Sequence, residues 1–221
     1  MDWQALLLSL QLAGVTLLLL LPPGLWLARW LARMRFAGKG WVEALVVLPL
    51  VLPPTVLGYY LLVSLGGASP VGRWLANTLG VSLTFNFAGL VLASLVFNLP
   101  FIVQPVQRAF ESIPRNLAEA AAVSGLSGWQ TFWRVELPLA WPGVLSAMVL
   151  TFVHTLGEFG VVLMMGGSIP GETKTVAIAI YDRVQAFDLS GADRMALLLL
   201  VLSLGAVGAS FFASARLALR R

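Results

Sequence analysis

His154 and Glu158 are the polar residues of this chain that could do chemistry inside an apolar stretch. They lie four positions apart, so a helix would place them on one face. Three interpretations remain open: a hydrogen-bonded pair that holds helices together, a hinge or gate, and a metal site. A tetrahedral metal site needs three or four protein ligands, and the chain has no cysteine and one histidine. We therefore expect no bound metal, and we favour a hinge or gate because Gly157 and Gly160 permit close helix contact beside the carboxylate.

Nucleotide chemistry has no matching motif in this sequence. A P-loop requires Gly, four residues, and then Gly-Lys followed by Ser or Thr, so that backbone amides cradle the phosphates. Around the pair Gly38-Lys39, Arg33 stands where the first glycine is needed and Gly40 stands where Ser or Thr is needed. We expect that the chain is not an enzyme and binds no cofactor, and that any ATP is hydrolysed, with Mg²⁺, on a separate subunit.

The composition is that of a membrane protein. Of 221 residues, 59% are hydrophobic and only 11% are charged, with a mean hydropathy of +0.89. A soluble domain carries roughly a quarter charged residues. The formal charge of +4 is therefore interpreted through the placement of basic residues around a lipid bilayer, and no nucleic-acid partner is expected.

Five apolar segments predict five membrane-spanning helices, because about 20 apolar residues cross roughly 30 Å of hydrocarbon. We expect an all-α polytopic helix bundle that forms one domain over residues 1–221. A long loop at 166–194 contains the short apolar stretch 175–180, which could re-enter the membrane or line its outer face; a sixth span made from it is the minor alternative. The predicted spans are residues 5–28, 42–65, 85–106, 141–165 and 195–218.

The basic residues predict an orientation in the cell inner membrane. No basic residue precedes the first apolar segment, whereas several follow it, which is the reverse of a secretory signal. With the N-terminus outside and the C-terminus in the cytoplasm, the inner segments hold the majority of Lys and Arg, as the positive-inside rule requires. The inner residues are then Arg29, Arg33, Arg35, Lys39, Arg108, Arg115, Arg134, Arg216, Arg220 and Arg221, against Arg73, Lys174, Arg183 and Arg194 outside.

Prolines interrupt the second predicted span. Each proline removes an amide donor and bends or breaks a helix, and broken backbone at membrane depth is tolerated only against protein or a water-filled cavity. The segment is either a kinked packing helix or part of a transport path. We predict that the path or gate is formed by Pro53, Pro54, Thr55, Tyr59, Gly157, Glu158 and Gly160.

The predicted cytoplasmic segment, residues 108–140, has the pattern of a helix–turn–helix elbow. An Ala-rich stretch at 117–123 strongly favours helix, and Gly125 ends it. A second helical stretch at 129–135 is expected to stop at Pro138.

The elbow is either an ordinary loop folded on its own bundle or a docking element for another protein. Ala120, Ala121 and Gly125 would allow close approach of a partner's backbone. Glu119 and Arg115, four apart, could pair with each other or with the partner's charges. The apolar residues that could fill pockets of a partner are Leu117, Val123, Leu126 and Phe132.

This segment resembles the EAA loop of binding-protein-dependent ABC importer permeases. Glu119-Ala120-Ala121, Gly125 and Leu137-Pro138 stand at that loop's spacing, with Val135 where Ile is usual. The resemblance implies a type I ABC importer permease fold and a coupling helix that docks on a cytoplasmic ABC ATP-binding subunit. By the same resemblance, the contact residues are Arg115, Leu117, Glu119, Ala120, Ala121, Gly125 and Leu126.

Three further segments, residues 48–59, 156–160 and 169–173, resemble molybdate permease subunits, and sulfate permeases share softer versions of them. The resemblance implies a homodimeric molybdate importer that works by alternating access and receives its anion from an extracytoplasmic binding protein. Tungstate or sulfate remain alternative substrates. A secondary transporter independent of ATP and a non-transporting scaffold are the alternative classes.

Overall fold

The computed structural model describes the backbone of residues 1–219 and their side chains, except those of Arg115, Ala118, Ala122 and residues 213–219. Helices account for the regular structure of this part of the chain. Four of them are long and apolar enough to cross a membrane, and a bent pair raises the number to five. The elements are α1 (Trp3–Arg33), α2 (Lys39–Val51), α3 (Pro54–Leu65), α4 (Pro70–Leu79), α5 (Phe87–Glu111), α6 (Arg115–Val123), α7 (Gly128–Thr131), the π-helix η1 (Phe132–Glu136), α8 (Leu137–Leu156), α9 (Gly160–Gly166), α10 (Val176–Gln185) and α11 (Leu189–Leu219).

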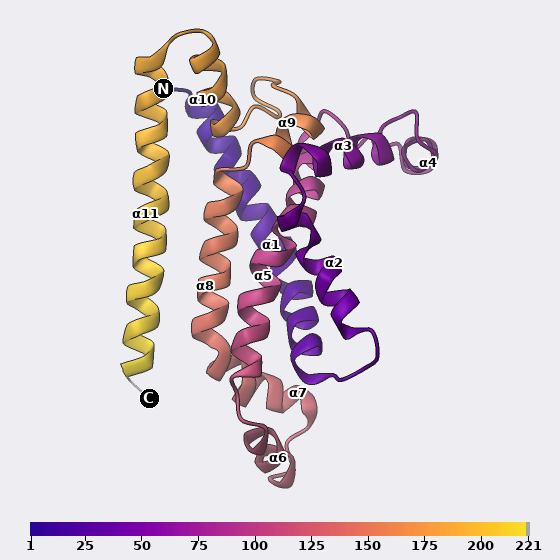
Figure 1. Cartoon of the computed structure of the whole chain (residues 1–221), viewed down its shortest axis with the longest axis vertical. Helices are drawn as coiled ribbons and strands as arrows, with labels where there is room; N and C mark the ends of the chain where they lie inside the picture. Colours follow the sequence, from indigo (N-terminus) through magenta and orange to yellow (C-terminus); the bar gives the residue numbers. More distant parts are fainter. Residues whose placement is uncertain (220–221) are drawn as a thin grey trace.

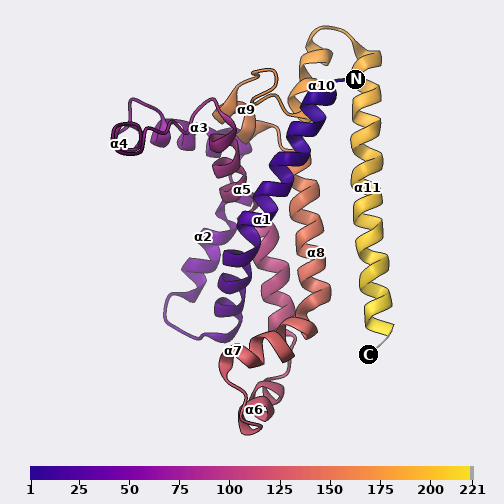
Figure 2. The same cartoon turned by 180° about the vertical axis from the view of Figure 1, so that it is seen from behind.

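Helices α1, α5 and α8 form the centre of the bundle (Figures 1 and 2). All three helices contribute buried apolar side chains to one core cluster, among them Leu31, Phe110 and Val144. Small residues allow the close approach: a Cβ on Gly143 of α8 would lie 2.5 Å from the Cβ of Ala109 on α5. This close packing of small residues is typical of helices in a bilayer, where no hydrophobic effect drives helices together.

The second predicted span is a pair of helices rather than one. Helix α2 ends at Val51, helix α3 begins at Pro54, and the two axes differ by 106°. Leu52 is extended (ψ 140°), as expected for a residue before proline. Helix α3 and the short α4 therefore extend sideways from one end of the bundle (Figure 1). Pro49 lies inside α2 without ending it.

The fourth predicted span is also interrupted. Helix α8 ends at Leu156, nine residues before the predicted end of the span, and α9 resumes at Gly160. The stretch 175–180 supplies the N-cap, Thr175, and the first half of α10, a helix of ten residues that is too short to cross a membrane. Helix α10 lies beside the N-terminal end of α1 (Figure 1), where the Val176 N–H donates a hydrogen bond of 2.8 Å to Ser9 Oγ.

Helix α11 stands at the side of the bundle and packs mainly on α8 and α10 (Figures 1 and 2). Only 11% of its most apolar window is buried within the chain. Leu200, Val201 and Leu204 are exposed on it, so this helix offers an apolar surface to lipid or to another protein. The all-α membrane-bundle prediction is confirmed.

Candidate translocation gate and coupling surface

Two helix breaks meet in the structure. Pro53 and Pro54 start α3, and residues 157–159 separate α8 from α9. A Cβ on Gly160 would lie 3.0 Å from the Cβ of Pro54 and 3.3 Å from the backbone N of Thr55. The structure thus brings together Pro54, Thr55 and Gly160, which are more than 100 positions apart in the sequence.

Helices α3 and α9 are in backbone contact beyond the breaks. A Cβ on Gly58 would lie 2.7 Å from the Cβ of Met164 and 3.1 Å from the Cα of Val161. The 2.7 Å distance is shorter than real Cβ contacts, so a side chain at Gly58 would force α3 and α9 apart. Sequence reasoning gave Gly58 no role of its own.

Glu158 lies in the break between α8 and α9 and is 3% exposed. Ser94 Oγ donates to one carboxylate oxygen and Asn98 Nδ2 donates to the other. Both donors are fully buried on α5. The carboxylate therefore fastens the interrupted backbone to α5, and both of its oxygens already have donors.

His154 is connected to this carboxylate through Asn98. Its Nδ1 lies 2.9 Å from Asn98 Oδ1, and because an amide oxygen can only accept, Nδ1–H is the donor. The imidazole stacks on Phe101 with ring centroids 3.9 Å apart. His154 and Glu158, which were predicted as a pair, are therefore linked indirectly, through the side-chain amide of Asn98 on α5. Ser94 and Asn98 were missed by sequence reasoning, although their spacing of four on an apolar helix was a usable signal.

The cluster contains one carboxylate, from Glu158, and one imidazole, from His154. Within residues 1–219, no three His, Cys, Asp or Glu side chains gather closely enough to hold a metal ion. An anion also gains no hydrogen-bond donor from Glu158, because both of its oxygens accept from Ser94 and Asn98. The cluster can hold the chain between α8 and α9 in a fixed position against α5. We call Glu158 with Ser94, Asn98 and His154 the Glu158 brace.

The other predicted path residues lie on the exposed side of α3. Pro53, Thr55 and Tyr59 are exposed in the single chain. Tyr59 packs edge-on against Tyr60, with ring centroids 5.7 Å apart, and does not join the Glu158 cluster. Gly157 ends α8, where its N–H donates to the His154 carbonyl at 3.1 Å. The predicted gate therefore divides into a buried brace and an exposed face.

Helix α6 lies at the opposite end of the molecule from α10, below the bundle in Figure 1. The helix ends in a Schellman motif: Gly125 has φ +79° and the Leu126 N–H donates to the Ala121 carbonyl at 3.1 Å. A positive φ is the reason for glycine here. A Cβ on Gly125 would meet nothing within 4 Å, so the space beside it is open in the single chain.

A capping box then starts the next helix. Ser127 Oγ accepts from the Gln130 N–H, and the Gln130 side chain accepts from the Ser127 N–H at 2.9 Å. The chain continues through α7 and η1 directly into α8. The expectation that Pro138 stops this helix is wrong, because Pro138 lies inside the continuous helical span Gly128–Leu156. The preceding π-helical turn, closed by Leu137 N–H to Phe132 O, changes the spacing of the carbonyls with which a proline would clash.

The predicted coupling residues differ in exposure. Glu119, Ala120 and Gly125 are exposed, whereas Ala121 faces inward. The side chain of Arg115 lies outside the described part. The remaining members of the predicted surface are Leu117, 40% exposed, Val123, 90% exposed, and Leu126, partly buried.

Phe132 does not belong to the exposed surface of the elbow. It packs against Phe110 of the core, with ring centroids 6.3 Å apart, and the Arg29 guanidinium lies 5.3 Å from its ring. The expectation that Phe132 fills a partner's pocket is therefore wrong, because the residue closes the underside of the elbow.

Glu136 anchors the elbow to α1. The carboxylate is 3% exposed, Arg29 Nε donates to it at 2.6 Å, and Arg33 Nη2 lies 3.0 Å from its other oxygen. Such a buried, doubly paired carboxylate fixes the position of the chain between η1 and α8. Sequence reasoning used the two arginines only for orientation and missed Glu136.

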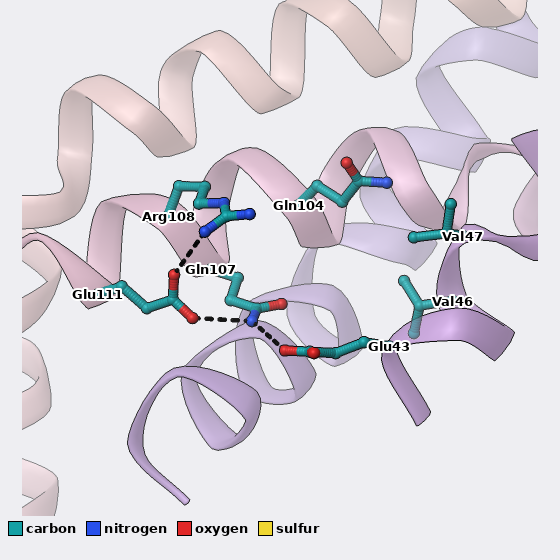
Figure 3. Close-up of a pocket in the computed structure, with 7 residues that line it drawn as sticks. All are labelled: Glu43, Val46, Val47, Gln104, Gln107, Arg108 and Glu111. Atoms are coloured by element: carbon teal, nitrogen blue, oxygen red, sulfur yellow. Dashed lines mark hydrogen bonds and ion pairs between the residues drawn. The ribbon is translucent and has the colours of Figure 1, made fainter. Parts of the chain in front are cut away.

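A polar cavity of about 380 Å³ lies between α2 and α5 at the same end of the bundle (Figure 3). Gln107 Nε2 donates to Glu43 at 2.7 Å and to Glu111 at 2.9 Å. Lys39 adds an ion pair with Glu43 at 3.6 Å, and Arg108 pairs with Glu111 at 3.3 Å. The network connects α2 to the end of α5, four residues before α6 begins.

The loop before α10 carries ion pairs at the other end of the bundle. Lys174 Nζ lies 2.8 Å from Asp182, and Ser168 Oγ donates to the same carboxylate at 3.0 Å. Partial burial alone would raise the pKa of Asp182, but these hydrogen bonds and the Lys174 charge lower it overall. The backbone N–H of Gly191 and the Arg183 guanidinium likewise lower the pKa of Asp188. Both acids therefore stay ionised at neutral pH.

Taken together, these features define a multi-pass membrane helix bundle with an exposed helix at one end and a braced pair of helix breaks inside. Residues 21–221 match the family of binding-protein-dependent transport system inner membrane components. The chain belongs to this family and is an inner membrane component of a transport system.

Relatives and solved structures agree with this assignment. The chain is 51% identical to the molybdenum transport system permease protein ModB of Azotobacter vinelandii over 88% of this chain and 86% of the relative. It is 36% identical to the sulfate transport system permease protein CysT of Escherichia coli, over 82% and 65% respectively. A chain of a bacterial ABC transporter that imports the acidic polysaccharide alginate superposes with a TM-score of 0.79, covering 96% of this chain and 78% of that chain at 21% identity. The type I ABC importer permease fold, expected from the sequence, is confirmed.

Proposed function

We propose that this chain is the permease subunit of an ATP-driven, binding-protein-dependent importer of molybdate. The observation that carries the substrate is the 51% identity to a molybdenum permease over most of both chains. The lower identity to a sulfate permease makes sulfate the alternative substrate to test. Tungstate is a second alternative, because it has the same shape and charge as molybdate. The anion crosses between two states of the bundle by alternating access.

ATP hydrolysis belongs to a separate ABC ATP-binding subunit, with its Mg²⁺, and this chain itself is not an enzyme. The exposed α6 supports this division, because Ala120 and the open space beside Gly125 allow close approach of a partner, and Glu119 adds an exposed charge. Helix α6 is the coupling helix in this proposal, and Leu117 and Val123 supply its apolar contacts.

A second copy of the chain completes the pathway. The exposed apolar side of α3 and the largely uncovered α11 support a homodimer, which is the commonest symmetric solution. The exposed residues Pro53, Thr55 and Tyr59 then face the path, and the Glu158 brace with Gly157 and Gly160 controls the adjacent break.

The N-terminus lies outside and the α6 end lies in the cytoplasm. The arginines around the α6 end, including Arg29, Arg33, Arg108 and Arg134, support this orientation. The extracytoplasmic binding protein then docks at the α10 end, where Lys174, Asp182, Arg183 and Asp188 form a charged surface.

The test is uptake of labelled molybdate by vesicles that contain this chain, its ATPase and its binding protein, with sulfate in a parallel arm. Molybdate uptake that requires both ATP and the binding protein is the expected result. Uptake of sulfate alone would keep the class and reject the substrate. Uptake indifferent to ATP would reject the class in favour of a secondary transporter.

A further inference from the structure

A groove of about 600 Å³ runs between α1 and the start of the α7–η1–α8 segment. Leu21, Leu25, Trp26 and Arg29 line it from α1, and Trp129 and Trp133 line it from α7 and η1. It lies away from the Glu158 brace and from the polar cavity of Figure 3. None of the functions assigned above uses it.

The groove changes from apolar to cationic along α1. Leu21 and Arg29 are eight residues apart, about 12 Å along a helix. Trp26 stands between these levels on α1, and Trp129 and Trp133 line the opposite wall. The three side chains are 68%, 70% and 50% exposed, in that order. Tryptophan prefers the boundary between hydrocarbon and head groups. Because both walls are ends of long apolar helices, the groove extends from the hydrocarbon into the head-group layer.

The cationic end has surplus positive charge. Arg29 and Arg33 share the single carboxylate of Glu136, so the trio has a net charge of +1. The Arg29 side chain remains 35% exposed, and a guanidinium has five N–H donors. Arg134, next to Trp133 in the sequence, is also exposed.

We propose that this groove binds an anionic phospholipid, with an acyl chain along Leu21 and Leu25 and the phosphate at Arg29. Basic pockets between membrane helices on the cytoplasmic side recognise anionic head groups in this way. If a second copy of the chain occupied the groove, we would expect its lining to be apolar, or basic, along its whole length. The observed change from apolar Leu21 and Leu25 to cationic Arg29 instead matches the acyl chain and phosphate of one lipid molecule.

The bound lipid would connect α1 to the segment that continues from α6. Trp129 and Trp133 contact each other edge-on, with ring centroids 5.5 Å apart, and Trp129 stacks near Phe132 at 6.0 Å. A lipid against these rings therefore braces the base of the elbow. The lipid site depends only on the groove and on its position at the membrane boundary, so it does not require the proposed substrate.

The test uses the full chain in nanodiscs, without ATPase or binding protein, and tryptophan fluorescence quenching by brominated phospholipids. Brominated phosphatidylglycerol should half-saturate quenching at about five-fold lower mole fraction than brominated phosphatidylcholine, the preference expected from one net positive charge. The five tryptophans outside the groove, of eight in the chain, give a background common to both lipids.

Gly128→Leu is the blocking variant, because Gly128 lines the groove and a Cβ there meets nothing within 4 Å. It should abolish the phosphatidylglycerol preference. Gly14→Leu is the matched control, since Gly14 lies on α1 outside the groove and also has open space; it should keep the preference. Arg29→Gln should keep the quenching but lose the headgroup preference. Equal quenching by both lipids, or a preference that survives Gly128→Leu, would overturn the proposal and leave the importer function untouched.

Discussion

Gly125 allows the coupling proposal to be tested against a purely local role for this residue. Its φ of +79° means that most side chains would be strained there, by about 1–2 kcal/mol. Asparagine tolerates this conformation much better. A Cβ would stand in open space, so Gly125→Asn should leave the isolated permease folded, with little change in its melting temperature.

The coupling role predicts a much larger effect on ATPase binding than on folding. If a partner's surface approaches Gly125 closely, an added side chain overpacks that contact by about 1–3 kcal/mol. This corresponds to a dissociation constant raised about 5- to 150-fold. Both Gly125→Asn and Gly125→Leu should show this loss when the ATPase is titrated onto the permease in nanodiscs, and molybdate uptake should fall with it.

Gly38 supplies the matched control for this experiment. It has φ +93°, open space at its Cβ and a place on the same side of the membrane in the proposed orientation, but it lies outside the elbow. Gly38→Asn and Gly38→Leu should therefore leave the dissociation constant unchanged. A Gly125→Asn permease that binds the ATPase and transports like wild type would refute the close-approach argument and leave Gly125 only its role in the turn.

Three further substitutions test the interior. Glu158→Gln keeps the shape but replaces one of the two oxygens that accept from Ser94 and Asn98 with an NH₂ donor. The protein should still insert, and uptake or the basal ATPase activity of the assembled transporter should change, whereas wild-type values for both would leave the residue a purely structural role. Gly160→Val must displace Pro54 and should destabilise the bundle by about 1–3 kcal/mol, read as a lower melting temperature; an unchanged value would contradict the packing. Glu136→Gln leaves two arginines facing a neutral amide and should cost about 1–3 kcal/mol, also seen as a lower melting temperature, whereas full stability would show that the pair is not structural.

The long helices could be predicted from the sequence because crossing a bilayer requires a local property, an unbroken apolar run. The break at Pro53 was equally local, since proline acts on its own helix. The end of α8 at Leu156 was missed, although Gly157 and Gly160 marked it. A run that is apolar throughout does not reveal where the backbone stops being helical.

The contacts that define the site could not be predicted in the same way. Asn98 meets Glu158 across 60 positions and Glu136 meets Arg29 across 107, so no spacing rule connects them. The prediction for Pro138 failed because a proline usually breaks the interior of a helix, whereas here a π-helical turn directly before it changes the backbone spacing. That turn has no sequence signature.

The elbow is stiff because its hydrogen bonds are closed locally. The Schellman motif after α6 and the capping box before α7 satisfy the turn within residues 120–130, and Glu136 fixes its far end to α1. Such a part transmits a displacement, because it has few internal degrees of freedom in which to absorb one. If the proposed ATPase docks on α6, a displacement of its surface would therefore pass through this segment into α8 instead of being absorbed within the elbow.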